Sequence, residues 1–282
     1  MGRIMDKYLI EKLKAIQGIV RSLESAALLF SAGVDSSLLL SLVREALGDK
    51  CLAITIDSPF ISRQEIEQAA LLANQMAAHH LIMPLDLLKE PGLSANPAER
   101  CYLCKRKMFS VAKQIAAQRG LAWVVDGTNA QDLEQHRPGL RASEELGIRS
   151  PLREAGLRKD EVRALAQELG LSNWNKPADS CLATRFPQGE PLNREKLSLI
   201  DRGERFLKEL GLSCFRLRYH SQNQGQSKTL RQMAAWNQLA RVQPSAADRK
   251  RILGLGLWPK IASGLKELGF ETAILDLEDY CP

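Results

Sequence analysis

The sequence lacks any apolar run of the roughly 20 residues that a membrane-crossing helix needs. Its first segment, MGRIMDKYLIEKLKAI, is charged and helical in pattern, and it lacks the apolar core and small-residue cleavage site of a signal peptide. Asp6 stands where a myristoylation signal carries Ser or Thr. We therefore expect a cytoplasmic protein without a membrane anchor.

Aromatic residues are also scarce, at 5% of the 282 residues, and Lys and Arg are spread along the chain. A nucleic-acid partner is therefore not expected, since such proteins carry a basic stripe interleaved with aromatics. The formal net charge of +6 would suit an anionic partner such as a nucleotide, although a solvated mixed surface is the simpler explanation. A chain of this length can form one large domain or two unequal ones.

The first half of the chain alternates strand-like and helix-like segments. Strand patterns occur at 26–31, 51–57, 79–86 and 122–128, and helical patterns at 36–47, 62–76, 104–120 and 158–171. Such alternation predicts an α/β domain whose parallel sheet has helices on both faces. We expect this domain to span 1–189.

After Gly189 the pattern changes. A helix is predicted at 193–211, strands at 213–220, 239–244 and 270–278, and mostly helical structure at 246–269. The polar stretch 221–238 has no clear pattern. We expect residues 190–282 to form a smaller α/β domain that contributes to substrate binding or oligomerisation.

The stretch SAGVDSS interrupts an apolar run between the first strand and its helix. In a parallel sheet this turn lies at the carboxyl edge, where ligands bind. Small residues let backbone N–H groups approach an anion, and the helix N-terminus adds a positive dipole end. Because an ordinary helix cap needs only one polar residue, the loop predicts phosphate binding by Ser31, Gly33, Val34, Asp35, Ser36 and Ser37.

No Walker lysine follows this loop, so it differs from the Gly-Lys-Ser/Thr nucleotide loops. SAGVDSS instead resembles the Ser-Gly-Gly-x-Asp-Ser loop of the PP-loop ATP pyrophosphatases, which cleave ATP between the α and β phosphates. Ala32 stands where that pattern has Gly, which matters if the position needs a positive φ. The resemblance also implies that Asp57 and Ser58, at the end of the second strand, meet the adenosine.

Six cysteines, Cys51, Cys101, Cys104, Cys181, Cys214 and Cys281, do not imply disulfides in a reducing cytoplasm. Cys51 begins an apolar strand pattern, Cys214 lies beside another strand, and Cys281 is next to the end of the sequence. Close spacing in such a compartment indicates metal or redox chemistry more often. Cys101 and Cys104 in CYLC and Cys181 in ADSCLATRF are therefore the candidates.

Longer motifs point to one family among these ATP pyrophosphatases. DGTNAQD, RPGLRASEELGIRSPL, NKPADSCLATRFPQGEPL, FRLRYH and LKELGFETAILDLEDY together resemble the LarE-type sulfur transferases, which help to make the nickel-pincer nucleotide cofactor. The resemblance covers most of the chain. It implies an enzyme that uses ATP and Mg²⁺ to adenylylate a carboxylate of a pyridinium mononucleotide and then replaces AMP with sulfur.

The resemblance implies two ways to carry that sulfur. Some family members lose the sulfur of a cysteine at the position of Cys181, whereas others hold a [4Fe–4S] cluster on three cysteines. This chain has all three, Cys101, Cys104 and Cys181, which favours the cluster and leaves one iron without a protein ligand. A sacrificial or persulfide cysteine, a redox disulfide, inert thiols and zinc remain alternatives. Structural zinc would need a fourth ligand, and His79, His80, His136 and His220 could supply one only through the fold.

The resemblance to the LarE-type family also implies roles for other residues. Asn129, Arg141, Lys176 and Arg185 are candidate contacts of ATP or the acyl adenylate, with surface salt bridges as the alternative. Arg216, Arg218 and His220 alternate on one strand and would suit a substrate phosphate, with a solvated face as the alternative. Glu204 matches an acidic position near the sulfur site, although a solvent-facing helix residue is an alternative. Gln243 stands where the family has Glu, which leaves the acceptor open.

Two other enzyme classes and a non-enzymatic role are alternatives to this function. Some tRNA thiolases pair a PP-loop with three cysteines, and amidotransferase-type ligases use the same loop with a glutaminase segment that this sequence lacks. If Ala32 prevents catalysis, the chain could instead be a non-enzymatic ATP-binding or iron-storage module. The resemblance further implies a homo-oligomer built on trimers, possibly a hexamer. The acceptor and the system that supplies the sulfur are not identified by the sequence.

Overall fold

The computed structural model describes residues 7–134, 138–177, 180–221 and 238–280. The chain forms two compact units. The first unit contains residues 1–58, 63–86 and 99–179, and the second contains 59–62, 87–98 and 180–282. The domain boundary expected after Gly189 remains a prediction, and Ser180 begins the long final part of the second unit.

The first unit is built on a parallel four-stranded sheet. Its strand order is β3-β2-β1-β4, with β1 at Ala26–Leu29, β2 at Cys51–Asp57, β3 at His79–Pro84 and β4 at Trp123–Val125. In register, Ala26 is paired with Cys51 on one side and with Trp123 on the other. The central strands β1 and β2 are buried along almost their whole length, which explains why they are continuous apolar runs in the sequence.

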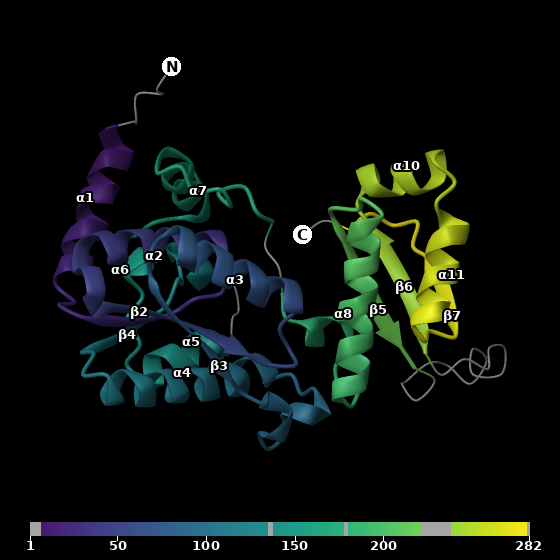
Figure 1. The fold of residues 1–282 in the computed structure, drawn as a ribbon, viewed down its shortest axis with the longest axis horizontal. Helices are drawn as coiled ribbons and strands as arrows, with labels where there is room; N and C mark the ends of the chain where they lie inside the picture. The colour runs from purple at the N-terminus through teal and green to yellow at the C-terminus, as the bar shows by residue number, and fades with distance from the viewer. Residues whose placement is uncertain (1–6, 135–137, 178–179, 222–237, 281–282) are drawn as a thin grey trace. The chain divides into compact units, whose positions relative to one another are not determined.

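Helices cover both faces of this sheet (Figure 1), with α1 and α2 on one face and α4 and α5 on the other. The helices of this unit are α1 (Lys7–Arg21), α2 (Val34–Leu47), α3 (Arg63–Gln75), α4 (Arg100–Gln118), α5 (Pro138–Glu145), α6 (Pro151–Glu154) and α7 (Lys159–Glu168). Apolar side chains of α1, α2 and α7 form one buried core with β1 and β2. This confirms the predicted α/β class with a parallel sheet.

The second unit is smaller and has a mixed sheet of order β5-β6-β7, with β5 antiparallel and β7 parallel to β6. Its elements are α8 (Arg194–Glu209), β5 (Phe215–His220), β6 (Leu239–Pro244), α10 (Ala246–Gly254), α11 (Trp258–Leu268) and β7 (Thr272–Leu275). Along β5 buried and half-buried residues alternate strictly. Helix α8 lies against the buried face at Leu217, because Gly203 has no Cβ, which would overlap that side chain.

Several predicted boundaries need correction. Helix α4 begins at Arg100, not at Cys104, so both cysteines of CYLC lie inside the helix. Helices α5 and α6 were not predicted, and the strand expected at 270–278 is confined to β7. Short 3-10 turns complete the described elements: η1 (Gly48–Lys50), η2 (Leu87–Lys89), η3 (Leu93–Ala95), η4 (Ala130–Glu134) and η5 (Leu182–Arg185).

Most of the polar stretch 221–238, together with Cys281 and His136, lies outside the described residues. Within the described ranges, no helix combines the length and apolar character that a membrane crossing requires.

Candidate active site

The predicted phosphate loop joins β1 to α2 in the first unit. Ser36 Oγ donates a hydrogen bond to Gly33 O at 3.1 Å and lies 3.2 Å from Ser31 Oγ. Ser37 N donates to Gly33 O at 2.9 Å, which starts the helix, and Val34 is buried in its first turn. The loop therefore precedes a helix N-terminus directly, the geometry that concentrates N–H donors on an anion.

Ala32 has a φ of 56°, in the left-handed region, and its side chain is fully buried. The position therefore requires the conformation that favours glycine. Its carbonyl accepts hydrogen bonds from Asn173 Nδ2 at 3.1 Å and Lys176 Nζ at 3.4 Å. Lys176, a predicted nucleotide contact, thus lies at the loop, and Asn173 is an addition that the sequence analysis did not select.

Asp35 is held from two directions. Asn129 Nδ2 donates to Asp35 Oδ1 at 3.0 Å, and Lys159 Nζ forms an ion pair with Asp35 Oδ2. The structure therefore brings together Asp35 and Asn129, which were each predicted as nucleotide contacts. Lys159 is the first residue of α7 and was missed, although its position at a predicted helix start marks it as a residue that can face an anion.

The segment after β4 packs directly on the loop helix. A Cβ added to Gly127 would lie 2.9 Å from Ser36 N, so only glycine fits without a backbone shift. The neighbouring Asp126 is buried and accepts hydrogen bonds from Ser150 Oγ at 2.7 Å and Thr128 Oγ1 at 2.7 Å. This network fixes the backbone of residues 126–128 against the first turn of α2.

At the end of β2, Asp57 forms an ion pair with Arg63, and Ser58 is fully buried with its carbonyl accepting from Arg63 at 3.5 Å. Nearby, Thr55 Oγ1 donates to Phe30 O at 2.8 Å and lies 2.8 Å from His80 Nε2. Because the single hydroxyl proton goes to Phe30, His80 Nε2 must donate. Burial lowers the pKa of His80 below its usual value, so this imidazole is neutral at pH 7.

Cys101 and Cys104 lie three residues apart on α4, which places them on one helix face. Cys101 is exposed and Cys104 half-buried, and neither forms a disulfide. The intervening Tyr102 is buried, donates from its hydroxyl to Glu145 Oε2 at 2.7 Å, and stacks 3.7 Å below the guanidinium of Arg141. Arg141 therefore contacts the cysteine-bearing helix, and its predicted contact with ATP remains a prediction.

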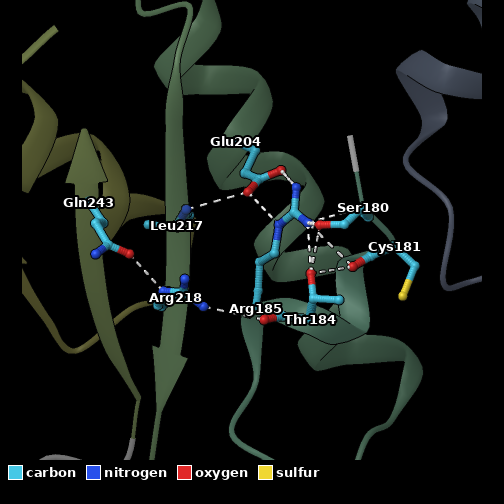
Figure 2. Close-up of polar contacts among 8 residues, drawn as sticks. All are labelled: Ser180, Cys181, Thr184, Arg185, Glu204, Leu217, Arg218 and Gln243. Carbon is cyan, nitrogen blue, oxygen red and sulfur yellow. Dashed lines mark hydrogen bonds and ion pairs between the residues drawn. The ribbon is translucent and has the colours of Figure 1, made fainter. Parts of the chain in front are cut away.

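Cys181 lies in the second unit, at the start of η5 (Figure 2). Arg185 Nη1 donates to Ser180 O at 2.6 Å and Cys181 O at 3.3 Å, and Thr184 Oγ1 donates to Cys181 O at 2.8 Å. Figure 2 shows the sulfur of Cys181 directed away from these contacts. The main chain of Cys181 is thus fixed through its carbonyl, on the side opposite to its thiol.

The guanidinium of Arg185 is itself anchored by Glu204. Arg185 Nε and Nη2 bind the two carboxylate oxygens at 2.8 and 3.0 Å, and the side chains are only 1% and 8% exposed. The alternative that Glu204 faces solvent is therefore wrong. In this arrangement Arg185 holds the Cys181 loop, and its contact with ATP remains a prediction.

Arg216, Arg218 and His220 share the half-buried face of β5, as predicted from their alternation. Arg218 Nε donates to Gln243 Oε1 at 2.8 Å and Arg218 Nη1 to Thr184 O at 3.5 Å (Figure 2). Arg216 lies over the Tyr280 ring at 4.9 Å. Arg241, which the sequence analysis did not select, is paired directly opposite Arg218 on β6.

Among the residues that the structure describes, no three His, Cys, Asp or Glu side chains are grouped as ligands of one metal ion. Cys101 and Cys104 belong to the first unit and Cys181 to the second. Cys51 is buried, and burial raises its pKa to about 12, which makes its thiol unreactive.

Residues 22–208, about two thirds of the chain, match the family described as thiamine biosynthesis protein (ThiI). The chain is 33% identical over 273 residues to pyridinium-3,5-bisthiocarboxylic acid mononucleotide synthase of Lactiplantibacillus plantarum, covering 96% of this chain and 92% of that protein. It is 34% identical over 270 residues to an uncharacterised protein of Synechocystis sp., covering 95% and 94%. A shorter match, 34% over 152 residues, covers 50% of this chain and 48% of one subunit of a glutamine-hydrolysing GMP synthase of Methanococcus maripaludis.

The sheet, the loop and these matches define the class as a PP-loop enzyme that uses ATP. Within that class, the chain belongs to the LarE-type sulfur transferases, as its motifs indicated. It is an ATP-dependent, sulfur-transferring enzyme.

Proposed function

We propose that this enzyme adenylylates a carboxylate of a pyridinium mononucleotide and then replaces AMP with sulfur, as a step in making the nickel-pincer nucleotide cofactor. The observation that carries the proposal is the similarity to the Lactiplantibacillus synthase over 96% of the chain. The PP-loop supports it, because its serine hydroxyls lie at a helix N-terminus, where they can bind phosphate. In the first step the carboxylate oxygen attacks the α-phosphorus and pyrophosphate leaves. In the second step sulfur attacks the acyl carbon and AMP leaves.

The first unit supplies the ATP chemistry. Ser31, Gly33, Ser36 and Ser37 lie at the N-terminus of α2, where hydroxyl and N–H donors can bind phosphate oxygens. Asp35, the carboxylate of this loop, would hold Mg²⁺. Lys159 forms an ion pair with that carboxylate and adds a cation to the phosphate loop.

The three cysteines fit the sulfur chemistry. Cys101, Cys104 and Cys181 are free of disulfides and none is fully buried. Three thiolates are a suitable ligand set for a [4Fe–4S] cluster, which when bound supplies an iron without a protein ligand where sulfide can be carried. The reducing cytoplasm that the sequence predicts would keep these thiols available. Arg185 and Thr184 hold the main chain of Cys181 by its carbonyl.

The second unit offers the acceptor a basic strand face at Arg216, Arg218 and His220. A mononucleotide phosphate suits guanidinium groups, which bind oxyanions with paired N–H donors. Glu204 would act by positioning, since both of its carboxylate oxygens are occupied by Arg185.

The first test measures iron and acid-labile sulfide in protein purified without oxygen. We expect about four irons per chain in the parent, largely lost in Cys181→Ala and Cys104→Ala and retained in Cys214→Ala. Cys214 is the matched control because it is half-buried and free of disulfides as well. If the reconstituted parent holds no iron, the cluster is excluded, and Cys181 becomes the candidate sulfur donor, detectable as a mass loss after one turnover.

A second test follows pyrophosphate release from ATP in the presence of pyridinium-3,5-biscarboxylic acid mononucleotide. Release that depends on this acceptor and is lost in Asp35→Asn would support the proposal, because Asp35 lies in the phosphate loop. Release stimulated only by tRNA would contradict it and favour a tRNA thiolase. Light scattering of the same sample tests the expected trimer-based oligomer.

A further inference from the structure

Basic side chains gather on one face of the second unit's sheet. Arg216, Arg218 and His220 lie on the half-buried face of β5, and the antiparallel register pairs Arg218 with Arg241 on β6. Side chains directly opposite each other in such a pair have Cβ atoms roughly 5 Å apart, and like charges there repel. The face therefore concentrates two guanidinium groups at one register position.

The partners of these groups are unequal. Arg241 Nε donates to Asp276 Oδ2 at 2.8 Å, so Arg241 has a carboxylate partner. Arg218 hydrogen-bonds only the neutral oxygens of Gln243 and Thr184 within the described ranges. Burial, with Arg241 and the other nearby arginines, lowers the pKa of Arg218. A half-buried guanidinium without a carboxylate is costly, which is the condition that a bound anion relieves.

His220 adds a second unsatisfied group beside the arginines. Its Nε2 is buried and has no hydrogen-bond partner among the residues that the structure describes. Buried polar atoms are nearly always paired, so an unpaired one calls for a ligand or a water. Burial and the charges of Arg241 and Arg218 lower the pKa of His220 and keep this imidazole neutral, and its other neighbour of opposite charge is Glu190.

We propose that Arg241 completes the acceptor's phosphate site, binding the phosphate together with Arg218 and His220. The inference rests on the proposed function and adds to it a residue that neither the motifs nor the comparisons assign. A phosphate monoester is favoured over a carboxylate because it carries a second negative charge, which matches two opposed guanidinium groups.

If the role of Arg241 were purely structural, we would expect Asp276 to engage its whole guanidinium group. The contacts differ from that expectation, because Arg241 Nε and Nη2 both bind the same oxygen, Asp276 Oδ2. The remaining nitrogen, Nη1, has no partner within the described ranges and can donate to a ligand. The Arg241 side chain keeps 33% exposure, whereas Asp276 has 10%, so the guanidinium is the reachable member of the pair.

The test measures how much the phosphate contributes to binding. The probes are nicotinic acid mononucleotide and nicotinic acid riboside, which differ only in the phosphate, and calorimetry gives the two dissociation constants for the full-length enzyme. We expect the parent to bind the nucleotide at least about tenfold more tightly than the riboside. Arg241→Met should lose most of that ratio, and Arg241→Lys should keep part of it.

Two further variants keep the test decisive. Arg241→Met with Asp276→Asn removes both charges, so no carboxylate is left unpaired, and it should bind as weakly as Arg241→Met alone. Lys266→Met is the control, since Lys266 is an exposed cation on α11 in the same unit, and it should keep the parent ratio. If the parent shows no preference for the nucleotide, or if both Arg241 variants keep it, the inference is wrong.

This outcome is separable from the proposed function. The proposed reaction is tested by pyrophosphate release and iron content in the parent enzyme, so weaker acceptor binding in the Arg241 variants does not affect that test. A parent enzyme that prefers the nucleotide but releases no pyrophosphate would retain the phosphate site and contradict the proposed reaction instead.

Discussion

Replacing Glu204 with alanine should reduce the free energy of unfolding by about 3–5 kcal/mol. Glu204 and Arg185 form a two-point ion pair at 2.8 and 3.0 Å, with side chains that are 8% and 1% exposed. Removing the carboxylate leaves a guanidinium buried away from water and without its counter-charge. The loss also frees Leu217 N, which now donates to Glu204 Oε1 at 3.4 Å.

Most of this loss of stability comes from leaving the Arg185 charge buried without its partner, and less comes from losing the attraction between the two side chains. A double variant can separate these two contributions. Replacing both residues, Arg185→Met with Glu204→Leu, removes the charge as well as the pair. This double variant should be more stable than the sum of the single losses predicts, by roughly 1–3 kcal/mol of coupling. Glu204→Gln keeps one acceptor and should be intermediate.

Urea unfolding provides the assay, and Glu209→Ala is the matched control because Glu209 is an exposed glutamate on the same helix. We expect the control to change stability by no more than about 0.5 kcal/mol. Peptide-mapped alkylation adds a local readout, since loss of the Arg185 anchor should speed modification of Cys181 but not of Cys101. A loss below about 1 kcal/mol for Glu204→Ala would refute the reasoning.

Three other predictions concern the first unit. Gly127→Ala should weaken ATP binding and cost about 1–3 kcal/mol, because its Cβ would lie 2.9 Å from Ser36 N; calorimetry and unfolding check both, and Gly18→Ala, which meets nothing within 4 Å, should be tolerated. Lys159→Met should raise the KM for ATP about tenfold, the size of one charge-assisted contact, yet change stability by less than about 1 kcal/mol because its pair with Asp35 is partly exposed. For His80, whose pKa is lowered by burial, the unfolded chain binds a proton that the folded chain refuses below about pH 6.5. Stability should therefore fall as the pH drops from 7.5 to 5.5, and His80→Gln should flatten that fall, which urea unfolding across this pH range measures.

The fold could be predicted where a local pattern carries the information. Strand β2 was expected at 51–57 and has those bounds, because a fully buried parallel strand must be a continuous apolar run. The start of α4 was missed because Glu99 precedes it without a side-chain cap, so the usual signal is absent. Helix α6 spans only Pro151–Glu154, which is too short to show a periodicity.

The site residues also differ in whether a local sequence pattern could predict them. The phosphate loop lies within seven consecutive residues, so its composition alone predicted it. Its partners Asn173 and Lys159 come from far along the chain, and only the fold brings them to Ala32 and Asp35. Asp126 follows β4 directly, a position at the carboxyl edge that could have marked it as a site residue.

Ala32 shows how a departure from the glycine pattern can be tolerated. A φ of 56° costs alanine about 1–2 kcal/mol relative to the right-handed region. Two terms oppose this cost: glycine would lose about 0.5–1 kcal/mol more chain entropy on folding, and the buried methyl group contributes about 0.8 kcal/mol. The terms nearly cancel, so the alanine is compatible with an intact loop.

Two substitutions at this position test the balance. Ala32→Gly should change the free energy of unfolding by less than about 1 kcal/mol in either direction. Ala32→Val should lose several times more, because a β-branched residue fits the left-handed region poorly and the site is fully enclosed. ATP binding should follow the same order, since the Ala32 carbonyl accepts from both Asn173 and Lys176 and a shifted backbone would break those bonds. A large gain in stability for Ala32→Gly would show that the methyl group contributes little, and that the enzyme retains real strain in its phosphate loop.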